Sequence, residues 1–186
     1  GQTRTFVLPR PETTPERLAA GPDGAVWFTE WLGNRVGRIA PDGTITEYPI
    51  PRDHRYPRGI TTGPDGNVWF TEWGASAIGR ITPKGKVTEY PLPRAGSEPN
   101  SIVAGPDGNL WFTETDENRI GRITPKGKIT EYAIGPSHTQ PQQITVGPDG
   151  NLWFTMRYRG KAGPDGAYVL GAVGRITPKG QITEFP

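Results

Sequence analysis

One segment of about 42 residues occurs four times in this chain, and the repetition limits the folds available to it. Each copy contains the turn sequence Gly-Pro-Asp-Gly, which begins at Gly21, Gly63, Gly105 and Gly147. A Trp-Phe-Thr triplet follows each turn, at Trp27, Trp69, Trp111 and Trp153. A Gly-Arg-Ile triplet comes next, at Gly37, Gly79, Gly121 and Gly174, so the fourth copy carries eleven extra residues before it. A strict period of this length is typical of repeat architectures.

Within one copy, Pro and Gly separate four short stretches that are rich in β-forming residues. In the second copy these stretches are 60–62, 67–72, 77–82 and 86–92, and we call them strands A to D in chain order. No stretch has the periodicity of a helix. Four antiparallel strands in about 42 residues match one blade of a β-propeller. We therefore predict an all-β propeller with four four-stranded antiparallel blades in the chain.

The expected organisation is a single propeller domain with one surplus strand at its start. Residues 6–10 (Phe-Val-Leu-Pro-Arg) align with residues 90–94 (Tyr-Pro-Leu-Pro-Arg), which end a D strand. The chain thus carries five D-type strands but four sets of A, B and C. The predicted units are an extra outer strand over 1–10 and blades over 11–52, 53–94, 95–136 and 137–186, the last with the insertion in its B–C loop.

Ring closure is the open question about this fold. A ring of four blades needs large angles between neighbours, and an open half-ring exposes two apolar blade faces. We expect two chains to share one eight-bladed ring with two-fold symmetry, so the predicted partner is a second copy in a homodimer. A closed four-bladed ring and a segment of a longer propeller are the alternatives.

Composition narrows the range of partners. The 186 residues include no cysteine, 21 Lys and Arg, and 19 Asp and Glu, for a formal net charge of +2. Because the two signs alternate along the chain, we expect no nucleic-acid partner. No apolar run approaches the roughly 20 residues of a membrane span, so we expect a soluble protein without a membrane partner. The cellular compartment does not follow from the sequence.

Variation among the copies indicates a candidate functional face. The A–B and C–D turns hardly change, whereas the B–C and D–A loops differ from copy to copy. Up-and-down connectivity places these variable loops on the same face of each blade. Variable loops on a rigid scaffold commonly carry function, although neutral drift of surface loops gives the same pattern. The longest loop, 156–172, contains Arg157 and Tyr158, which are suited to an anion or a flat ligand.

Residues 99–132 carry a family resemblance. Their sequence begins Pro-Asn-Ser-Ile-Val-Ala-Gly-Pro-Asp-Gly-Asn-Leu-Trp-Phe-Thr-Glu, continues through Asn-Arg-Ile-Gly-Arg-Ile-Thr and ends in Ile-Thr-Glu-Tyr. This pattern resembles the streptogramin B lyase family, also called virginiamycin B lyases, over nearly the whole chain. The resemblance implies a seven-bladed propeller and a Mg²⁺-dependent elimination that opens a cyclic depsipeptide antibiotic.

The catalytic positions that the resemblance implies are only partly matched. The family places a catalytic His directly after the Pro that precedes strand A, where this chain has Glu16, Arg58, Asn100 and Gln142. The partner Glu of the family ends Trp-Phe-Thr-Glu, where this chain has Glu30, Glu72, Glu114 and Met156. Because a His serves as general acid or base in such a reaction, its absence from all four positions argues against catalysis.

We therefore expect a non-catalytic, lyase-like scaffold or binding module that assembles into a closed ring, without catalytic residues or a cofactor. The candidate residues for binding a small polar or anionic ligand are Glu16, Glu30, Arg58, Asn100, Gln142, Arg157 and Tyr158. Near-identical repeats are also typical of a recently amplified, reconstructed or engineered sequence.

Two other functions stay open. The first is a Mg²⁺-dependent lyase that uses one of the two histidines of the chain, and its candidate catalytic residues are His54, His138, Glu72 and Glu114. Glu16 with Glu30 is the candidate pair of hard-oxygen metal ligands. The second is a protein-interaction propeller that uses the loop 156–172.

Overall fold

The computed structural model of the chain describes residues 3–11, 13–135, 139–158 and 171–185. In these residues the strands form four antiparallel sheets of four strands, each sheet in chain order, which confirms the predicted all-β blades. Blade 1 contains β1 (Pro15–Ala20), β2 (Val26–Glu30), β3 (Arg35–Ile39) and β4 (Ile45–Pro49). Blade 2 contains β5 (Pro57–Thr62), β6 (Val68–Glu72), a short 3₁₀ turn (Trp73–Ala75), β7 (Ala77–Ile81) and β8 (Val87–Pro91).

The other two blades repeat this pattern. Blade 3 contains β9 (Pro99–Ala104), β10 (Leu110–Glu114), β11 (Arg119–Ile123) and β12 (Ile129–Ala133). Blade 4 contains β13 (Thr139–Val146), β14 (Leu152–Tyr158), β15 (Ala172–Ile176) and β16 (Ile182–Phe185). No helix within the described residues is long and apolar enough to cross a membrane.

The Gly-Pro-Asp-Gly turn of each blade is tied to the Trp that follows it. In blade 2, Trp69 Nε1 donates a 2.9 Å hydrogen bond to Asp65 Oδ1, and Arg80 lies 3.8 Å from the other carboxylate oxygen. The Arg80 guanidinium also lies over the rings of Trp69 and Tyr90, at 5.5 and 5.6 Å from their centroids. The same bond from Trp to Asp and the same aromatic stacking recur in the other blades. These motif residues therefore serve the fold.

The Gly of each Gly-Arg-Ile triplet makes room for the Phe on the neighbouring strand. Phe70 on β6 lies directly opposite Gly79 on β7, and a Cβ at Gly79 would overlap the Phe70 ring. The same overlap would occur at Gly37, Gly121 and Gly174. Glycine in a strand interior often marks such a close approach, which explains its place here.

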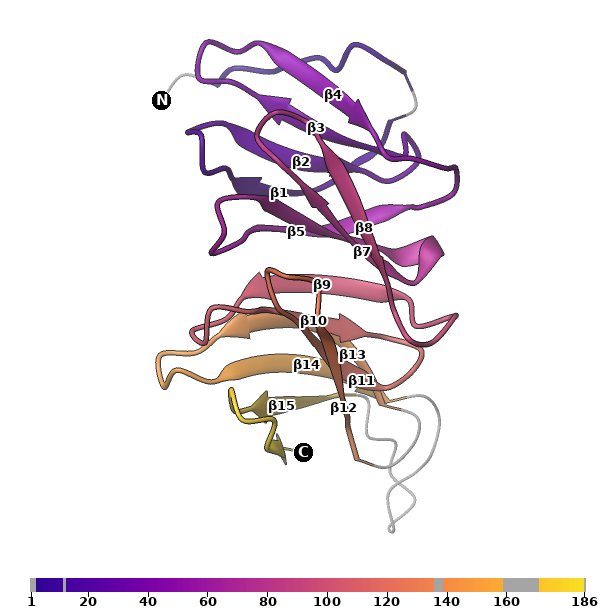
Figure 1. Cartoon of the computed structure of the whole chain (residues 1–186), viewed down its shortest axis with the longest axis vertical. Coiled ribbons are helices and arrows are strands. Elements are labelled where there is room, and N and C mark those ends of the chain that lie inside the picture. Colours follow the sequence, from indigo (N-terminus) through magenta and orange to yellow (C-terminus); the bar gives the residue numbers. More distant parts are fainter. Residues whose placement is uncertain (1–2, 12, 136–138, 159–170, 186) are drawn as a thin grey trace.

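The four blades pack face to face in chain order and form an open arc. The first strands of successive blades lie next to one another, and three buried apolar clusters fill the three interfaces. In the first interface, Trp27 and Val36 of blade 1 pack with Ile60, Val68 and Phe70 of blade 2. Figure 1 shows blade 1 and blade 4 at opposite ends of the molecule. The described chain therefore does not close into a ring by itself.

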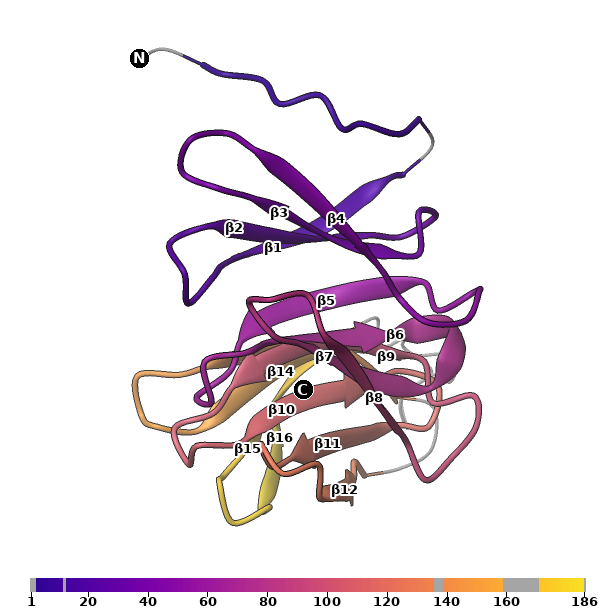
Figure 2. The same cartoon turned by 45° about the horizontal axis from the view of Figure 1, so that its top comes forward.

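The N-terminal segment, residues 3–11, lies along the free side of blade 1 and joins no sheet (Figure 2). Phe6 lies beside the turn at Gly43, just as Tyr48 lies beside the turn at Gly85 in the next blade. The segment thus takes the place that the fourth strand of a preceding blade would have. It forms no ladder there, because the described chain has no third strand beside it.

An ion pair supports the same alignment of the N-terminal segment. Arg10 Nε lies 3.4 Å from Glu47 Oε2 on β4. The equivalent Arg94, which follows β8, lies 3.6 Å from Glu131 on β12. Residues 3–11 therefore contact blade 1 through Phe6, as the Tyr of each fourth strand contacts the next blade, and through Arg10, as Arg94 contacts blade 3.

Candidate functional site

Hydrogen bonds join the B–C loop of a blade to the following D–A loop, and these loops together form one loop face. Asn34 has a positive φ of 52°, and its Nδ2 donates to the Arg52 carbonyl at 2.8 Å. Its Oδ1 accepts from the backbone N–H of Arg55, also at 2.8 Å. Ser76 and Asn118 bridge the loops at the equivalent places in blades 2 and 3.

Four polar side chains near the start of the first strands form a polar row, which consists of Glu16, Arg58, Asn100 and Gln142. Neighbours in the row bond in pairs. Arg58 Nε lies 3.3 Å from Glu16 Oε1, and Asn100 Nδ2 donates to Gln142 Oε1 at 3.3 Å. The fold thus brings four of the predicted binding residues into two contacting pairs, each of which joins two blades.

An aromatic cluster, made of Trp31, Tyr56 and Trp73, lies on the loop face of blades 1 and 2. Trp31 and Tyr56 stack with ring centroids 5.2 Å apart, and Trp73 lies 5.3 Å from Trp31. Arg58 Cζ lies 5.4 Å from the Trp31 ring centroid, so the cluster meets the polar row at this residue. The three rings are half-buried. Aromatic faces beside a guanidinium are suited to flat or anionic groups.

The sequence-based prediction does not include Trp31, Tyr56 or Trp73. A signal for two of them was present, because the second position after Trp-Phe-Thr holds Trp in blades 1 and 2 but Thr115 and Arg157 in blades 3 and 4. The backbone N–H of Trp73 donates to the carbonyl of Tyr56 at 3.2 Å. This bond places an aromatic residue of the D–A loop beside one of the B–C loop.

The glutamates that end the second strands lie beneath the loop face. Glu30, Glu72 and Glu114 are fully buried. Burial, followed by the neighbouring Glu89 carboxylate, raises the pKa of Glu72 to about 8. Burial and the fourth-strand glutamate of the same blade likewise raise the pKa of Glu30 and of Glu114 to about 7. These carboxyls therefore hold a proton for much of the time near neutral pH.

Arg55 links this buried layer to the loop face. Its Nε lies 2.9 Å from Glu89 Oε1 and 3.7 Å from Glu72 Oε2. The residues on either side of it have positive φ, 60° at His54 and 48° at Tyr56. Such a conformation costs a non-glycine residue about 1–3 kcal/mol. The ion pairs of Arg55 therefore hold a strained loop that presents His54 and Tyr56.

Of the remaining predicted residues, two end a strand and one contacts the aromatic cluster. Arg157 is exposed near the end of β14, and Tyr158 is the last residue of that strand. His54 is exposed and meets the edge of the Tyr56 ring, with the ring centroids 6.0 Å apart. His138 lies outside the described residues.

The candidate metal ligands Glu16 and Glu30 lie in different environments. Glu16 pairs with Arg58, whereas Glu30 is fully buried within blade 1. Among the residues that the structure describes, no three His, Cys, Asp or Glu side chains come together to hold a metal ion. Mg²⁺ is usually held by one or two carboxylates together with waters. Glu16, which is paired with a guanidinium, and Glu30, which is buried inside a blade, do not fit such a site.

A small polar pocket of about 180 Å³ lies beside the polar row, and its lining includes Arg17, Gly59, Asn100, Ser101 and Gln143. Asn100 is buried, and its Oδ1 has no hydrogen-bond partner within the described part of the chain. A buried amide oxygen of this kind is suited to an N–H or O–H group. At the pocket, Asn100 therefore offers the polar row an acceptor for a ligand.

Four-stranded blades packed in an arc, with variable loops gathered on one face, define the chain as a β-propeller-type repeat protein. The chain belongs to the virginiamycin B lyase family, whose model matches residues 1–186. The resemblance found in the sequence is thereby confirmed.

Solved structures of family members match the whole arc. A streptogramin B lyase structure is 42% identical, with a TM-score of 0.85, over 97% of this chain and 57% of that chain. A catalytically inactive virginiamycin B lyase from Staphylococcus aureus with quinupristin is 45% identical, with a TM-score of 0.87, over 96% of this chain and 57% of that chain. The chain thus spans just over half the length of these relatives.

Curated relatives align over about one repeat. Virginiamycin B lyase from Bordetella pertussis is 42% identical over 45 residues, which are 24% of this chain and 15% of that protein. Virginiamycin B lyase from Nocardia farcinica is 46% identical over 50 residues, which are 27% of this chain and 18% of that protein.

Proposed function

We propose that this chain is a non-catalytic binding module that holds a small ligand with flat and polar or anionic groups on its loop face. The observation that carries the proposal is the contact between Arg58 and Trp31, which joins the aromatic cluster to the polar row. Arg58 pairs with Glu16 through Nε. The terminal N–H groups of a guanidinium can donate to a carbonyl or anionic group, which a ligand would supply here. The rings of the cluster supply a surface for a flat group.

The polar row is better suited to holding a ligand than to transforming it. An elimination needs a group that takes up a proton near neutral pH. Arg58 and the amides of Asn100 and Gln142 do not do so, and Glu16 is engaged by Arg58. The row can therefore orient a ligand by hydrogen bonds, but it offers no free base.

Quinupristin is a suitable probe, because the inactive family member from Staphylococcus aureus was solved with it. We expect the purified chain to bind quinupristin in calorimetry and to leave it intact in mass spectrometry, with or without Mg²⁺. Trp31→Ala and Arg58→Gln should each weaken binding about ten-fold or more, which corresponds to about 1.4 kcal/mol.

The matched control for these variants is Lys84→Ala, an exposed residue in the turn between β7 and β8. This turn lies at the other end of the strands from the loop face, so the affinity should not change. Unaltered affinity in both Trp31→Ala and Arg58→Gln would place the ligand elsewhere. Opening of the quinupristin ring by the purified chain would contradict a non-catalytic role, and absence of binding would reject this ligand class.

We also propose that two copies of the chain complete one ring of eight blades. The open arc supports this, because apolar residues are exposed at both of its ends. Val26 on blade 1 is 41% exposed and Val173 on blade 4 is 40% exposed. Their equivalents at the interfaces within the chain are fully buried. A closed ring would remove both residues from water.

The alternative function, a Mg²⁺-dependent lyase, is favoured by one observation. His54 contacts the Tyr56 ring, so one of the two histidines lies at the aromatic cluster, where it is placed to accept or donate a proton. Mg²⁺-dependent loss of intact quinupristin that is abolished in His54→Ala or His138→Ala would establish this function. Turnover that survives both substitutions would show that neither histidine is the catalytic base.

A further inference from the structure

The D–A loop that enters blade 2, residues 52–56, has three non-glycine residues with positive φ. They are Arg52 at 67°, His54 at 60° and Tyr56 at 48°. Residues other than glycine rarely adopt this conformation, which persists only where the surrounding structure holds it. Strain of this kind concentrates at sites that bind ligands. The loop is therefore a candidate binding element.

Blade 3 contains the equivalent loop 42 residues later, and this loop shows what the fold itself requires. The backbone N–H of Thr115 donates to the carbonyl of Glu98, just as that of Trp73 donates to the carbonyl of Tyr56. Glu98 has a φ of 48°, the same as Tyr56. The backbones of the two loops therefore follow the same path at this point.

The side chains of the two loops differ. Where blade 2 has His54, blade 3 has Gly96 with a φ of 81°, and glycine takes this conformation most easily. Where blade 2 has the rings of Tyr56 and Trp73, blade 3 has no ring. The fold thus forms this loop without an imidazole and without aromatic rings, so their presence in blade 2 needs another explanation.

The B–C loop of blade 2 is adapted to the D–A loop beside it. A Cβ at Gly74 would lie 2.5 Å from the carbonyl oxygen of His54 and 2.5 Å from the Tyr56 ring. The N–H of Gly74 donates to the carbonyl of Arg55 at 3.1 Å. Blade 3 has Asp116 at the position of Gly74. Glycine therefore lets the two loops of blade 2 approach each other closely.

His54 forms the outer edge of the aromatic cluster. It is exposed, and its ring meets the Tyr56 ring edge-on, at an interplanar angle of 62°. Among the residues that the structure describes, neither ring nitrogen of His54 has a hydrogen-bond partner. An imidazole can donate or accept a hydrogen bond. It is therefore placed to bond the rim of a flat group that stacks on the cluster.

We propose that His54 contacts the ligand of the loop face, and that its strained conformation is retained because it places the imidazole beside the aromatic cluster. This proposal rests on the binding function proposed above. It narrows the ligand class to an aromatic carboxylate with a polar atom at its rim. The rings of the cluster take the flat part, Arg58 takes the carboxylate and His54 bonds the polar atom.

Kynurenate is a suitable probe, because it is a flat ring system with a carboxylate at one edge and an oxygen at another. His54→Gly removes both the strain and the imidazole. We expect its affinity for kynurenate in calorimetry to fall about five-fold, as the loss of one hydrogen bond predicts. Quinaldate has the same rings and carboxylate without this oxygen, so its affinity should not change.

The same substitution should stabilise the fold, because blade 3 has glycine at this place in the loop. We expect the melting temperature of His54→Gly to rise by about 2–4 °C, the usual effect of a small gain in folding free energy in a chain of this size. His54→Ala keeps the strain but loses the imidazole. Its affinity for kynurenate should fall in the same way, and its melting temperature should not rise.

The reverse exchange in blade 3 is the matched control for strain. Gly96 has no atom within 4 Å of its missing Cβ, so Gly96→His adds strain without a clash. Its melting temperature should fall, and its affinity for kynurenate should stay unchanged.

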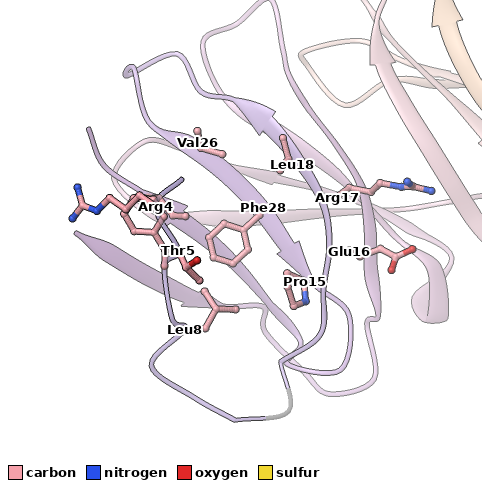
Figure 3. A pocket seen from close by; sticks show the side chains of 11 residues that line it. Arg4, Thr5, Leu8, Pro15, Glu16, Arg17, Leu18, Val26 and Phe28 are labelled. Carbon is pink, nitrogen blue, oxygen red and sulfur yellow. The ribbon is translucent and has the colours of Figure 1, made fainter. Parts of the chain in front are cut away.

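A second control concerns the apolar cavity of about 730 Å³ between the N-terminal segment and blade 1, because a flat probe can also enter it (Figure 3). Leu18 lines this cavity and is 73% exposed. Leu18→Gln should leave the affinity for kynurenate unchanged. A loss would place the probe in the cavity and contradict the site at His54.

Three other results would overturn the proposal in distinguishable ways. Unchanged kynurenate affinity in both His54→Gly and His54→Ala rejects the contact with His54 and leaves the loop-face site standing. A melting temperature that does not rise in His54→Gly rejects the strain as the cost of that contact. Absence of kynurenate binding by the unmodified chain rejects the narrower ligand class, whereas the broader binding function is decided separately by quinupristin.

Discussion

One residue of the loop face, Arg55, contacts the glutamates that lie buried beneath that face. Glu72 lies inside blade 2 beside Glu89, and burial together with this neighbour raises its pKa to about 8. The positive charge of Arg55, which lies beside both carboxyls, lowers the pKa of Glu72 and opposes part of this rise. Met156 holds the equivalent position in blade 4, so a blade folds without this carboxyl.

The free energy of unfolding should fall as the pH rises from about 5 to about 8. The folded-state pKa of Glu72, about 8, lies above its ordinary value of 4.5, so the folded chain keeps a proton that the unfolded chain releases. The stability from this proton is complete below the ordinary value and is lost as the pH rises through 8. Each carboxyl contributes at most about 1.4 kcal/mol per pH unit.

Urea unfolding at a series of pH values measures this slope. Glu72→Gln should flatten it, because the amide does not titrate. Met156→Glu should steepen it, because it adds a fourth buried carboxyl. An unchanged slope in both variants would contradict the role given to these glutamates.

The polar row could be predicted from the sequence, because each of its four members directly follows the Pro that precedes strand A of its blade. The aromatic cluster could not be predicted in full. Tyr56 reaches Trp73 only because His54 and Tyr56 adopt positive φ, and no residue pattern indicates that conformation in a non-glycine residue. The contact between Arg55 and Glu72 could not be predicted for the same reason, since it depends on where that loop places Arg55.

Strands and turns followed the sequence closely. The second strand of blade 2, predicted over 67–72, runs over Val68–Glu72. The first strand, predicted over 60–62, begins earlier at Pro57, because a shift in register between Pro57 and Ile60 lets the chain pair on both sides of it. The outer strand predicted over 1–10 lies in the fourth-strand place, but residues 3–10 pair with no other strand among the described residues.

Gly79→Ala tests how tightly two strands of a blade pack. The added Cβ would overlap the buried Phe70 ring, so we expect a loss of about 1–3 kcal/mol in the free energy of unfolding. Gly66→Ala is the matched control, because Gly66 has a φ of 70° but no atom near its missing Cβ. Its cost should be about 1–2 kcal/mol, because of the left-handed conformation alone. Phe70→Leu should reduce the loss caused by Gly79→Ala but not the loss caused by Gly66→Ala. If chemical denaturation gives the same loss for Gly79→Ala with Phe70 and with Leu at that position, the Phe contact is not what requires Gly79.

The whole molecule is an arc whose two ends match each other. Among the described residues, Val26 and Val173 are exposed at these ends, whereas their equivalents at the interfaces between blades are fully buried. This distribution is expected when one kind of interface is repeated and its first and last halves are unpartnered.

A charge placed in one end face should separate two copies. Val173→Asp puts a carboxylate at an apolar position of blade 4, and we expect it to shift the chain toward the monomer in sedimentation velocity. Leu32→Asp, at an exposed apolar residue of a B–C loop, is the control and should leave the distribution unchanged. Equal behaviour of the two variants would remove blade 4 from the interface.

The solution mass of the unmodified chain, measured by light scattering over a range of concentrations, is the most direct test of the two-chain ring. One chain has a mass of 20.3 kDa. A closed ring of two copies predicts a species of twice that mass that persists on dilution. A species of 20.3 kDa at all concentrations would contradict it.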